Sequence, residues 1–178
     1  WLKMHNNFKI IIYNKGNLLK DEGLGKVINI ENIGRESHTW LYHIVKNYKN
    51  LNEISIFLQG NIQDLNCMAH LNPNKYLKNI NQYGFTVSRY GLLSPFHWDW
   101  NVGLDKDNRY QKQWLNNEIS KSKIGFRGFA KTIFPDIPFF VATSYGGCFA
   151  VKKETILQHK VNFYEALLDI LSKSKNPI

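Results

Sequence analysis

The sequence predicts a single α/β domain with a mostly parallel central sheet flanked by helices. Two observations predict this class. Runs of β-branched and aromatic residues alternate along the chain with segments of helical periodicity, and the runs contain consecutive apolar residues rather than a strict alternation with polar ones. The chain has 178 residues and is 43% hydrophobic and 14% aromatic. Since this is enough for one core but short for two, we expect residues 1–178 to form one domain.

The two ends of the chain indicate a piece of a longer fold. The chain begins at Trp1 rather than at a methionine, and it ends at Ile178 directly after a helical pattern. We therefore expect the domain to be truncated at both ends, with flanking elements missing.

The first half of the chain carries the clearest structural signals. Residues 8–13 read FKIIIY, an apolar strand that stops at a turn, and residues 27–30 form a second, short strand. Residues 36–49 predict a helix, because apolar residues recur along one face. Residues 54–58 read ISIFL and predict a buried strand that ends at Gln59.

The second half is less regular. Residues 84–109 are rich in glycine and aromatic residues, and residues 120–138 contain two prolines, so we expect irregular structure in both segments. The remaining elements predicted from periodicity are helices at 64–70, 75–81, 110–119, 153–159 and 163–173, and strands at 139–142 and 148–151.

The composition is basic and includes two cysteines. The net charge is +9 and the pI about 9.5, which favours anionic partners. The lysines are scattered, so a solvated basic surface explains them better than nucleic-acid binding. Cys67 and Cys148 have no zinc-ligand spacing and indicate no disulfide framework. Because we also find no secretory signal and no membrane-spanning apolar run, we expect a cytoplasmic protein.

The segment from Gly34 to His38 gathers charged and titratable residues at a predicted helix start. A glycine before a helix leaves free backbone N–H groups that attract anions, and the Arg35 guanidinium suits phosphate or carboxylate. We therefore predict that Gly34 and Arg35 help to hold an anionic ligand, which Glu36 and His38 orient. The alternative is structural: Glu36 caps the helix and pairs with Arg35, and His38 is a surface histidine.

Gln59 and Gly60 stand at the carboxyl end of the predicted strand 54–58, where open sheets contact ligands. Gln59 would project toward the ligand, and Gly60 lets a ligand approach the backbone. Asp64, about one turn later, is the nearest carboxylate for a divalent cation. One aspartate and one amide make a poorer Mg²⁺ or Mn²⁺ site than two carboxylates. The alternative role of Gln59 is that of a structural hydrogen-bonding residue.

Residues 97–100 read HWDW and combine two aromatic faces with an imidazole and a carboxylate. Trp98 and Trp100 suit stacking on a sugar or a base. His97 and Asp99 would share one side of an extended segment, as a proton-transfer pair requires. Alternatively, the tryptophans anchor a long loop to the core.

Four motifs together resemble one family. They are Tyr13-Asn14-Lys15-Gly16, residues 32–44 (NIGRESHTWLYHI), Phe57-Leu58-Gln59-Gly60, and residues 147–151 (GCFAV) with Phe163-Tyr164-Glu165. In this order and rough spacing they look like the uncharacterised family named domain of unknown function 3431. The resemblance extends over nearly the whole chain, except that residues 84–135 match nothing.

That family is in turn distantly similar to nucleotide-sugar glycosyltransferases of the GT-A type, which are Rossmann-like. The resemblance implies nucleoside contacts at Tyr13, Asn14 and Lys15, and nucleotide contacts at Asn32, Gly34 and Arg35. It also implies an Asp-x-Asp metal motif at residues 57–61, where this chain has Gln59 and Asn61 instead. Dependence on Mn²⁺ or Mg²⁺ therefore has weak support.

We accordingly expect a glycosyltransferase-like domain that binds a nucleotide-sugar donor and transfers a glycosyl group to a glycan or small-molecule acceptor. The candidate catalytic residues are Asp64, His97 and Asp99. The residues expected to bind substrate are Tyr13, Asn14, Lys15, Asn32, Gly34, Arg35, Glu36, His38, Gln59, Gly60, Trp98 and Trp100. The alternative is a non-catalytic module that binds glycans or nucleotides.

Overall fold

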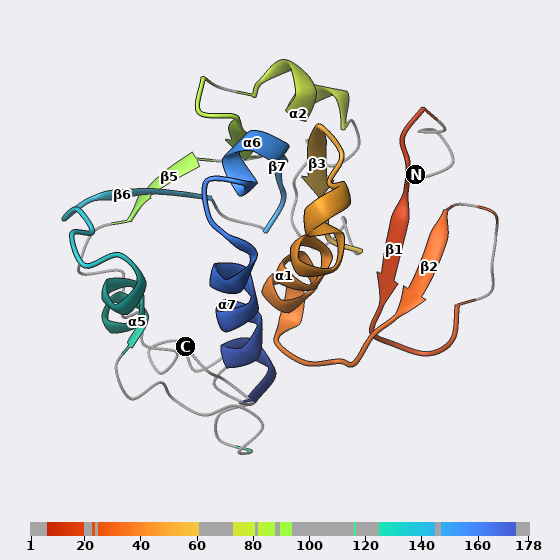
Figure 1. The fold of residues 1–178 in the computed structure, drawn as a ribbon, viewed down its shortest axis with the longest axis horizontal. Helices are drawn as coiled ribbons and strands as arrows, with labels where there is room; N and C mark the ends of the chain where they lie inside the picture. Colours follow the sequence, from red (N-terminus) through yellow and green to blue (C-terminus); the bar gives the residue numbers. More distant parts are fainter. Residues whose placement is uncertain are drawn as a thin grey trace.

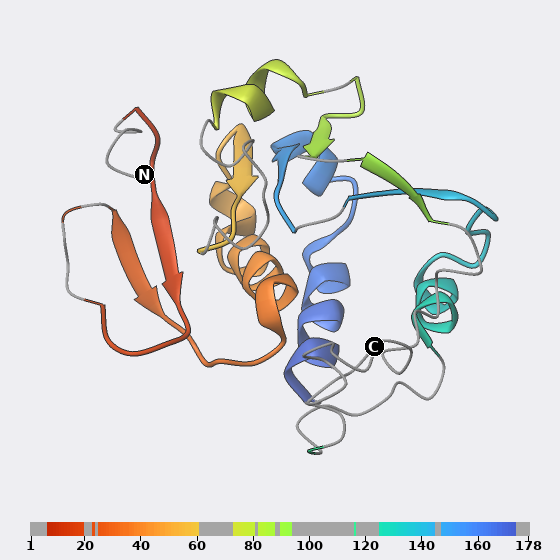
Figure 2. The ribbon, with the colours of Figure 1, turned by 180° about the vertical axis from the view of Figure 1, so that it is seen from behind.

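The computed structural model describes residues 7–19, 23, 25–60, 73–80, 82–87, 90–93, 116, 125–144 and 147–173. These residues form a mixed α/β protein, as the sequence predicts, but their strands belong to three small sheets. Two long helices lie side by side at the centre, with a two-stranded sheet on one side and smaller elements on the other (Figures 1 and 2).

Strands β1 (Ile11–Asn14) and β2 (Lys26–Asn29) pair in parallel and form the first sheet. They confirm the strands predicted at 8–13 and 27–30. The Asn14 side chain closes the turn after β1, because its Nδ2 donates to Asn29 Oδ1 at 2.9 Å and to Asn17 O at 2.8 Å.

Helix α1 (Arg35–Asn47) continues into a short 3-10 turn, η2 (Tyr48–Asn50). Together they confirm the helix predicted over 36–49. The N-cap is Gly34, which has a left-handed backbone (φ 58°, ψ 18°) that glycine adopts without steric cost.

Strand β7 (Phe149–Lys152) is the centre of the second sheet, with β3 (Ile54–Phe57) on one side and β4 (Phe85–Val87) on the other. Both pairs are antiparallel, so the prediction of a mostly parallel sheet was wrong for this part of the fold. Apolar composition indicates that a strand is buried, but it does not fix the direction of the neighbouring strand.

The third sheet pairs β5 (Tyr90–Leu93) with β6 (Val141–Ser144), again antiparallel. It lies at the edge of the molecule near helix α5 (Gly125–Ile133) (Figure 1). The short helices α2 (Asn74–Lys78) and α6 (Lys153–Ile156) were predicted, whereas β4, β5 and α5 fall in segments predicted to be irregular. The other two predicted helices fall almost entirely outside the described residues.

Helix α7 (Val161–Lys173) packs along α1 and closes the core. The largest buried cluster joins both helices to β3 and β7 through Ile44, Leu51, Phe57, Val151, Ile156 and Tyr164. A second cluster contains Cys148 and Ala150, both fully buried. None of the described helices is both long enough and apolar enough to cross a membrane.

Candidate functional site

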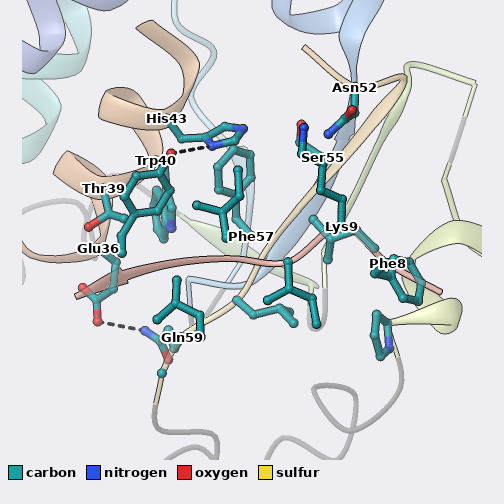
Figure 3. A pocket seen from close by; sticks show the side chains of 18 of the residues that line it. Phe8, Lys9, Glu36, Thr39, Trp40, His43, Asn52, Ser55, Phe57 and Gln59 are labelled. Carbon is teal, nitrogen blue, oxygen red and sulfur yellow. Dashed lines mark hydrogen bonds between the residues drawn. The ribbon is translucent and has the colours of Figure 1, made fainter. Parts of the chain in front are cut away.

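A cavity of about 840 Å³ lies between strands β1 and β3. Among the described strands, β1 pairs with β2 alone and β3 with β7 alone. The cavity wall is formed chiefly by residues 7–13, by residues 54–60 and by one face of α1 (Figure 3). The space between the first two sheets is therefore an open site rather than a strand pair.

Helix α1 supplies the polar part of the wall. Its lining residues after Arg35 are Glu36, Thr39, Trp40 and His43. Their spacing of i, i+3, i+4 and i+7 places them on one face of the helix. His38 lies on the opposite face and is buried near Leu171 of α7.

Glu36 and Gln59 meet at one end of the cavity. Gln59 Nε2 donates to Glu36 Oε1 at 3.0 Å and so joins the end of β3 to the start of α1 (Figure 3). Gly147, just before β7, approaches this contact closely: a Cβ there would lie 3.0 Å from Gln59 Nε2 and 3.1 Å from Trp40 Cζ2. Three segments that the sequence singled out thus converge at one point.

The described cavity wall carries more positive than negative side chains. Lys9, Lys15 and Arg35 line it, while Glu36 is its one carboxylate among the described residues. Like charges gathered around a concave site raise the local concentration of oppositely charged ligands. The site is therefore suited to an anion.

The start of α1 has an unusual backbone that Lys15 holds in place. Gly34 and Arg35 are both left-handed, with φ of 58° and 49°. Lys15 Nζ donates to Ile33 O at 2.5 Å and to Arg35 O at 2.6 Å, on either side of Gly34. Burial lowers the pKa of Lys15, and the nearby Glu36 carboxylate opposes this shift.

A hydrogen-bonded pair that the sequence analysis missed also lines the cavity. The Tyr13 hydroxyl and His43 Nδ1 lie 2.9 Å apart and link β1 to α1. Burial raises the pKa of Tyr13, and burial together with Lys9 lowers the pKa of His43. Tyr13 is therefore protonated and His43 neutral at pH 7. The helical spacing from Glu36 was the signal that would have identified His43.

The predicted substrate contacts divide into two groups. Those that line the cavity are Tyr13, Lys15, Arg35, Glu36, Gln59 and Gly60. The Asn14 amide is occupied in the turn after β1, Asn32 is exposed, and Gly34 packs against His38 and Leu171.

His38 is buried rather than on the surface, with 5% of its area exposed. Within the described part of the chain its Nδ1 has no hydrogen-bond partner. Burial lowers the pKa of His38, as does Lys15, while Glu31 raises it. The neutral form of His38 is therefore the stable one in the fold.

The remaining predictions concern residues that the structure does not describe. These are Asp64, His97, Trp98, Asp99 and Trp100, whose roles stay predictions. Among the residues described, no three histidine, cysteine, aspartate or glutamate side chains are grouped so as to hold a metal ion.

Comparison with known proteins gives one match. A family described as "Protein of unknown function (DUF3431)" matches residues 1–177. No curated protein and no solved structure matches the chain.

Proposed function

Because this chain belongs to the DUF3431 family, whose proteins are of unknown function, we propose its function from the cavity: it binds a nucleotide sugar and transfers the glycosyl group to an acceptor. In this reaction an acceptor hydroxyl replaces the nucleoside diphosphate at the anomeric carbon of the sugar. The proposal retains the GT-A-like arrangement, in which the end of β1, the start of α1 and the end of β3 form one site.

The observation that carries the proposal is the hydrogen bond of 3.0 Å between Gln59 and Glu36. It joins the carboxyl end of β3 to the start of α1, where Arg35 lines the same cavity. Lys15, just after β1, lines this cavity as well. A ligand in this part of the cavity would therefore be surrounded by Lys15, Arg35 and the Glu36–Gln59 pair.

The size and charge of the cavity support the same ligand class. Its volume of about 840 Å³ falls in the range of roughly 300–1,000 Å³ that is typical of small-molecule sites. A nucleotide sugar combines a flat base, an anionic diphosphate and a hydroxylated ring. The aromatic and aliphatic wall of the cavity matches the base, its cationic side chains match the diphosphate, and the Glu36–Gln59 pair matches the hydroxylated ring.

Each polar residue of the wall has a proposed role. Arg35 binds the diphosphate, because a guanidinium forms paired, charge-assisted hydrogen bonds to phosphate oxygens. The backbone N–H groups at the start of α1 add to this anion site. Glu36 and Gln59 bind hydroxyl groups of the sugar, and Trp40 beside them offers an aromatic ring for the apolar face of the sugar.

The described residues do not fit the divalent cation that the GT-A resemblance implies. Mg²⁺ and Mn²⁺ prefer several oxygen ligands, usually including carboxylates. The described wall supplies one carboxylate, Glu36, and its Oε1 already accepts a hydrogen bond from Gln59. We therefore assign no step of the reaction to a metal.

A second candidate function is a non-catalytic module that binds nucleotides or glycans in this cavity. The same Gln59–Glu36 hydrogen bond favours it, because it engages an oxygen of the one carboxylate in the described wall and gives that carboxylate a structural role. For either function we propose the cytoplasm as the compartment, since a chain with two cysteines in 178 residues indicates no disulfide framework and suits a reducing environment.

Isothermal titration with UDP-, GDP- and TDP-sugars, each with and without Mn²⁺, tests the proposal. We expect at least one donor to release heat and to saturate. Slow appearance of free nucleoside diphosphate in the presence of acceptor sugars would indicate a transferase, whereas binding without turnover would indicate the module. No heat from any donor would reject the transferase and a nucleotide-binding module.

The variant Arg35→Asn tests whether the Arg35 guanidinium binds the diphosphate of the donor. Asparagine tolerates a left-handed backbone but lacks the guanidinium. Loss of a charge-assisted hydrogen bond predicts a weakening of donor binding by about 10- to 100-fold. Lys26→Met is the matched control, because it also removes one positive charge but lies exposed on β2, away from the cavity. Equal effects of the two variants would contradict a specific role of Arg35.

A further inference from the structure

His43 is held in a fixed orientation on the cavity wall. Its ring meets the rings of Tyr13 and Phe57 edge-on, with centroid separations of 5.8 and 5.5 Å and interplanar angles of 83° and 84°. Its Nδ1 lies 2.9 Å from the Tyr13 hydroxyl (Figure 3). These contacts prevent the imidazole from turning, so each ring nitrogen has a defined surrounding.

The neighbours of Nδ1 determine which nitrogen carries the proton. Asn47 Nδ2 donates to His43 O at 2.7 Å, which fixes the amide, and it also lies 3.4 Å from His43 Nδ1. An N–H group on Nδ1 would therefore face a second donor and would leave the Tyr13 hydroxyl proton without this acceptor. Both conflicts disappear when Nδ1 is unprotonated and accepts from Tyr13.

The neutral ring then carries its proton on Nε2. His43 lines the cavity, and Nε2 is the nitrogen turned away from Tyr13. No residue in the described part of the chain hydrogen-bonds this nitrogen. Burial and the nearby Lys9 lower the pKa of His43, so the ring is neutral at pH 7. A residue of the cavity wall thus carries an uncharged N–H donor, in a part of the wall that is largely apolar and aromatic.

We propose that the Nε2–H group of His43 donates to a carbonyl oxygen of the nucleobase, and that Tyr13 is the residue that positions it. The inference rests on the proposed nucleotide site and extends it to the base. A neutral donor beside the Phe57 and Tyr13 rings suits a flat, uncharged ring with a keto group, as in uracil or guanine.

The spacing along α1 supports this orientation of the ligand. Arg35 and His43 are eight residues apart in the helix, which corresponds to about 12 Å along its axis. A nucleoside diphosphate with its phosphates at Arg35 extends its base over a comparable distance. The sugar then lies at the Glu36–Gln59 end, and Thr39, between the two positions on the same face, is next to the ribose.

The first experiment determines the tautomer without any ligand. Two-bond ¹H–¹⁵N correlation spectra of histidine-labelled protein, recorded at mildly alkaline pH, show which ring nitrogen is protonated. We expect the His43 signals of an Nε2–H tautomer. In Tyr13→Phe, which removes the donor to Nδ1, the fraction of the Nδ1–H tautomer should rise. A purely structural role of Tyr13 would leave this ratio unchanged.

The second experiment compares two amide replacements at position 43. In His43→Gln the side-chain amide reaches the place of the imidazole Nε2 and can still donate, whereas in His43→Asn it overlaps with Nδ1. We expect His43→Gln to bind UDP or GDP nearly as well as the natural protein. His43→Asn should bind about three- to tenfold more weakly, the effect of one lost hydrogen bond. Inorganic pyrophosphate, which has no base, should bind all three proteins equally.

The outcomes separate this inference from the proposed function. An Nδ1–H tautomer in the ligand-free protein overturns the inference whatever the nucleotides do. UDP or GDP binding that is the same in His43→Asn and His43→Gln overturns it while leaving the nucleotide site intact. A weaker binding of pyrophosphate to His43→Asn would also overturn it, because the loss would then not concern the base. Failure of UDP, GDP and pyrophosphate to bind at all rejects the nucleotide site, and the base contact with it.

Discussion

Arg35 has a backbone conformation that is costly for any residue with a Cβ atom. Its φ is 49°, and a left-handed conformation costs roughly 1–2 kcal/mol outside glycine. The two hydrogen bonds from Lys15 to the carbonyls around Gly34 offset part of this cost. Residues under such strain cluster at ligand sites, which agrees with the position of Arg35 on the cavity wall.

Gly34→Ala tests how closely the turn before α1 packs. An added Cβ would lie 2.6 Å from His38 Cβ and 3.1 Å from Leu171 O, at a φ of +58°. The clash and the left-handed backbone together predict a loss of about 2–4 kcal/mol in the free energy of unfolding. Urea denaturation measures this loss.

Gly60→Ala is the control for Gly34→Ala, because no atom of the residues that the structure describes lies within 4 Å of the Cβ that it adds. We expect its effect to stay within about 0.5 kcal/mol, as for an unhindered surface change. If both alanine variants lost the same stability, the close approach of Gly34 to α7 would not be the cause.

Helix α1 is the element that connects the core to the cavity. One face carries Glu36, Trp40 and His43 toward the cavity, while Ile44 is buried in the main core cluster and His38 lies beside α7. Small movements at the start of this helix therefore affect ligand residues and core residues together.

Lys15→Met tests the tie between the turn after β1 and the start of α1. The variant keeps the aliphatic stem but removes the donor to Ile33 O and Arg35 O. We expect a loss of about 1–2 kcal/mol in the free energy of unfolding. The His38 amide, which donates to Gly34 O at 3.1 Å, should also exchange its hydrogen faster.

Lys26→Met controls for the loss of a lysine charge, since Lys26 is exposed on β2. It should change neither stability nor exchange at His38. Unaltered exchange in Lys15→Met would mean that the helix start is held by other contacts.

The sequence predicted local elements well where hydrophobic patterns were strong. β1, β2, α1, β3, β7 and α7 lie within one to three residues of their predicted positions. β4 and β5 were missed because glycine and aromatic residues dominate their segment, and α5 because two prolines follow it. Strand direction was predicted correctly for β1 and β2, which are parallel, but wrongly for the other two sheets. Pairing partners such as β3 and β7 are far apart in the chain, and composition does not specify their orientation.

Residues of the candidate site were predictable from sequence where the pattern within a single segment marks them. The charged helix start at Arg35 and Glu36 and the strand end at Gln59 were identified from sequence, and all three line the cavity. His43 was missed because its importance comes from Tyr13, thirty residues earlier in the chain. The helical spacing from Glu36 places His43 on the cavity face of α1, but its contact with Tyr13 depends on tertiary packing and is not revealed by that spacing.

At the scale of the molecule, the cavity lies between two sheets whose described strands do not pair with each other. The β1–β2 sheet and the β3–β7–β4 sheet form opposite walls, and the Tyr13–His43 hydrogen bond connects β1 to α1 between them. A ligand that contacts both walls binds the folded state selectively. It should therefore raise the melting temperature as its concentration increases.

The stability of the whole fold should fall as the pH drops below about 6.5, the ordinary pKa of histidine. Burial lowers the pKa of both His38 and His43 in the folded state. In the window between these lowered pKa values and 6.5, the unfolded chain binds protons at both histidines while the folded chain does not. Proton uptake then favours unfolding, so the free energy of unfolding rises with pH in this window and levels off above it.

Urea denaturation at a series of pH values from neutral to mildly acidic measures this slope. His38→Gln and His43→Gln each remove one of the two groups, so each variant should show a shallower dependence on pH, whatever its absolute stability. A slope that neither His38→Gln nor His43→Gln reduces would mean that other groups take up the protons, and that burial of these two imidazoles does not destabilise the fold in acid.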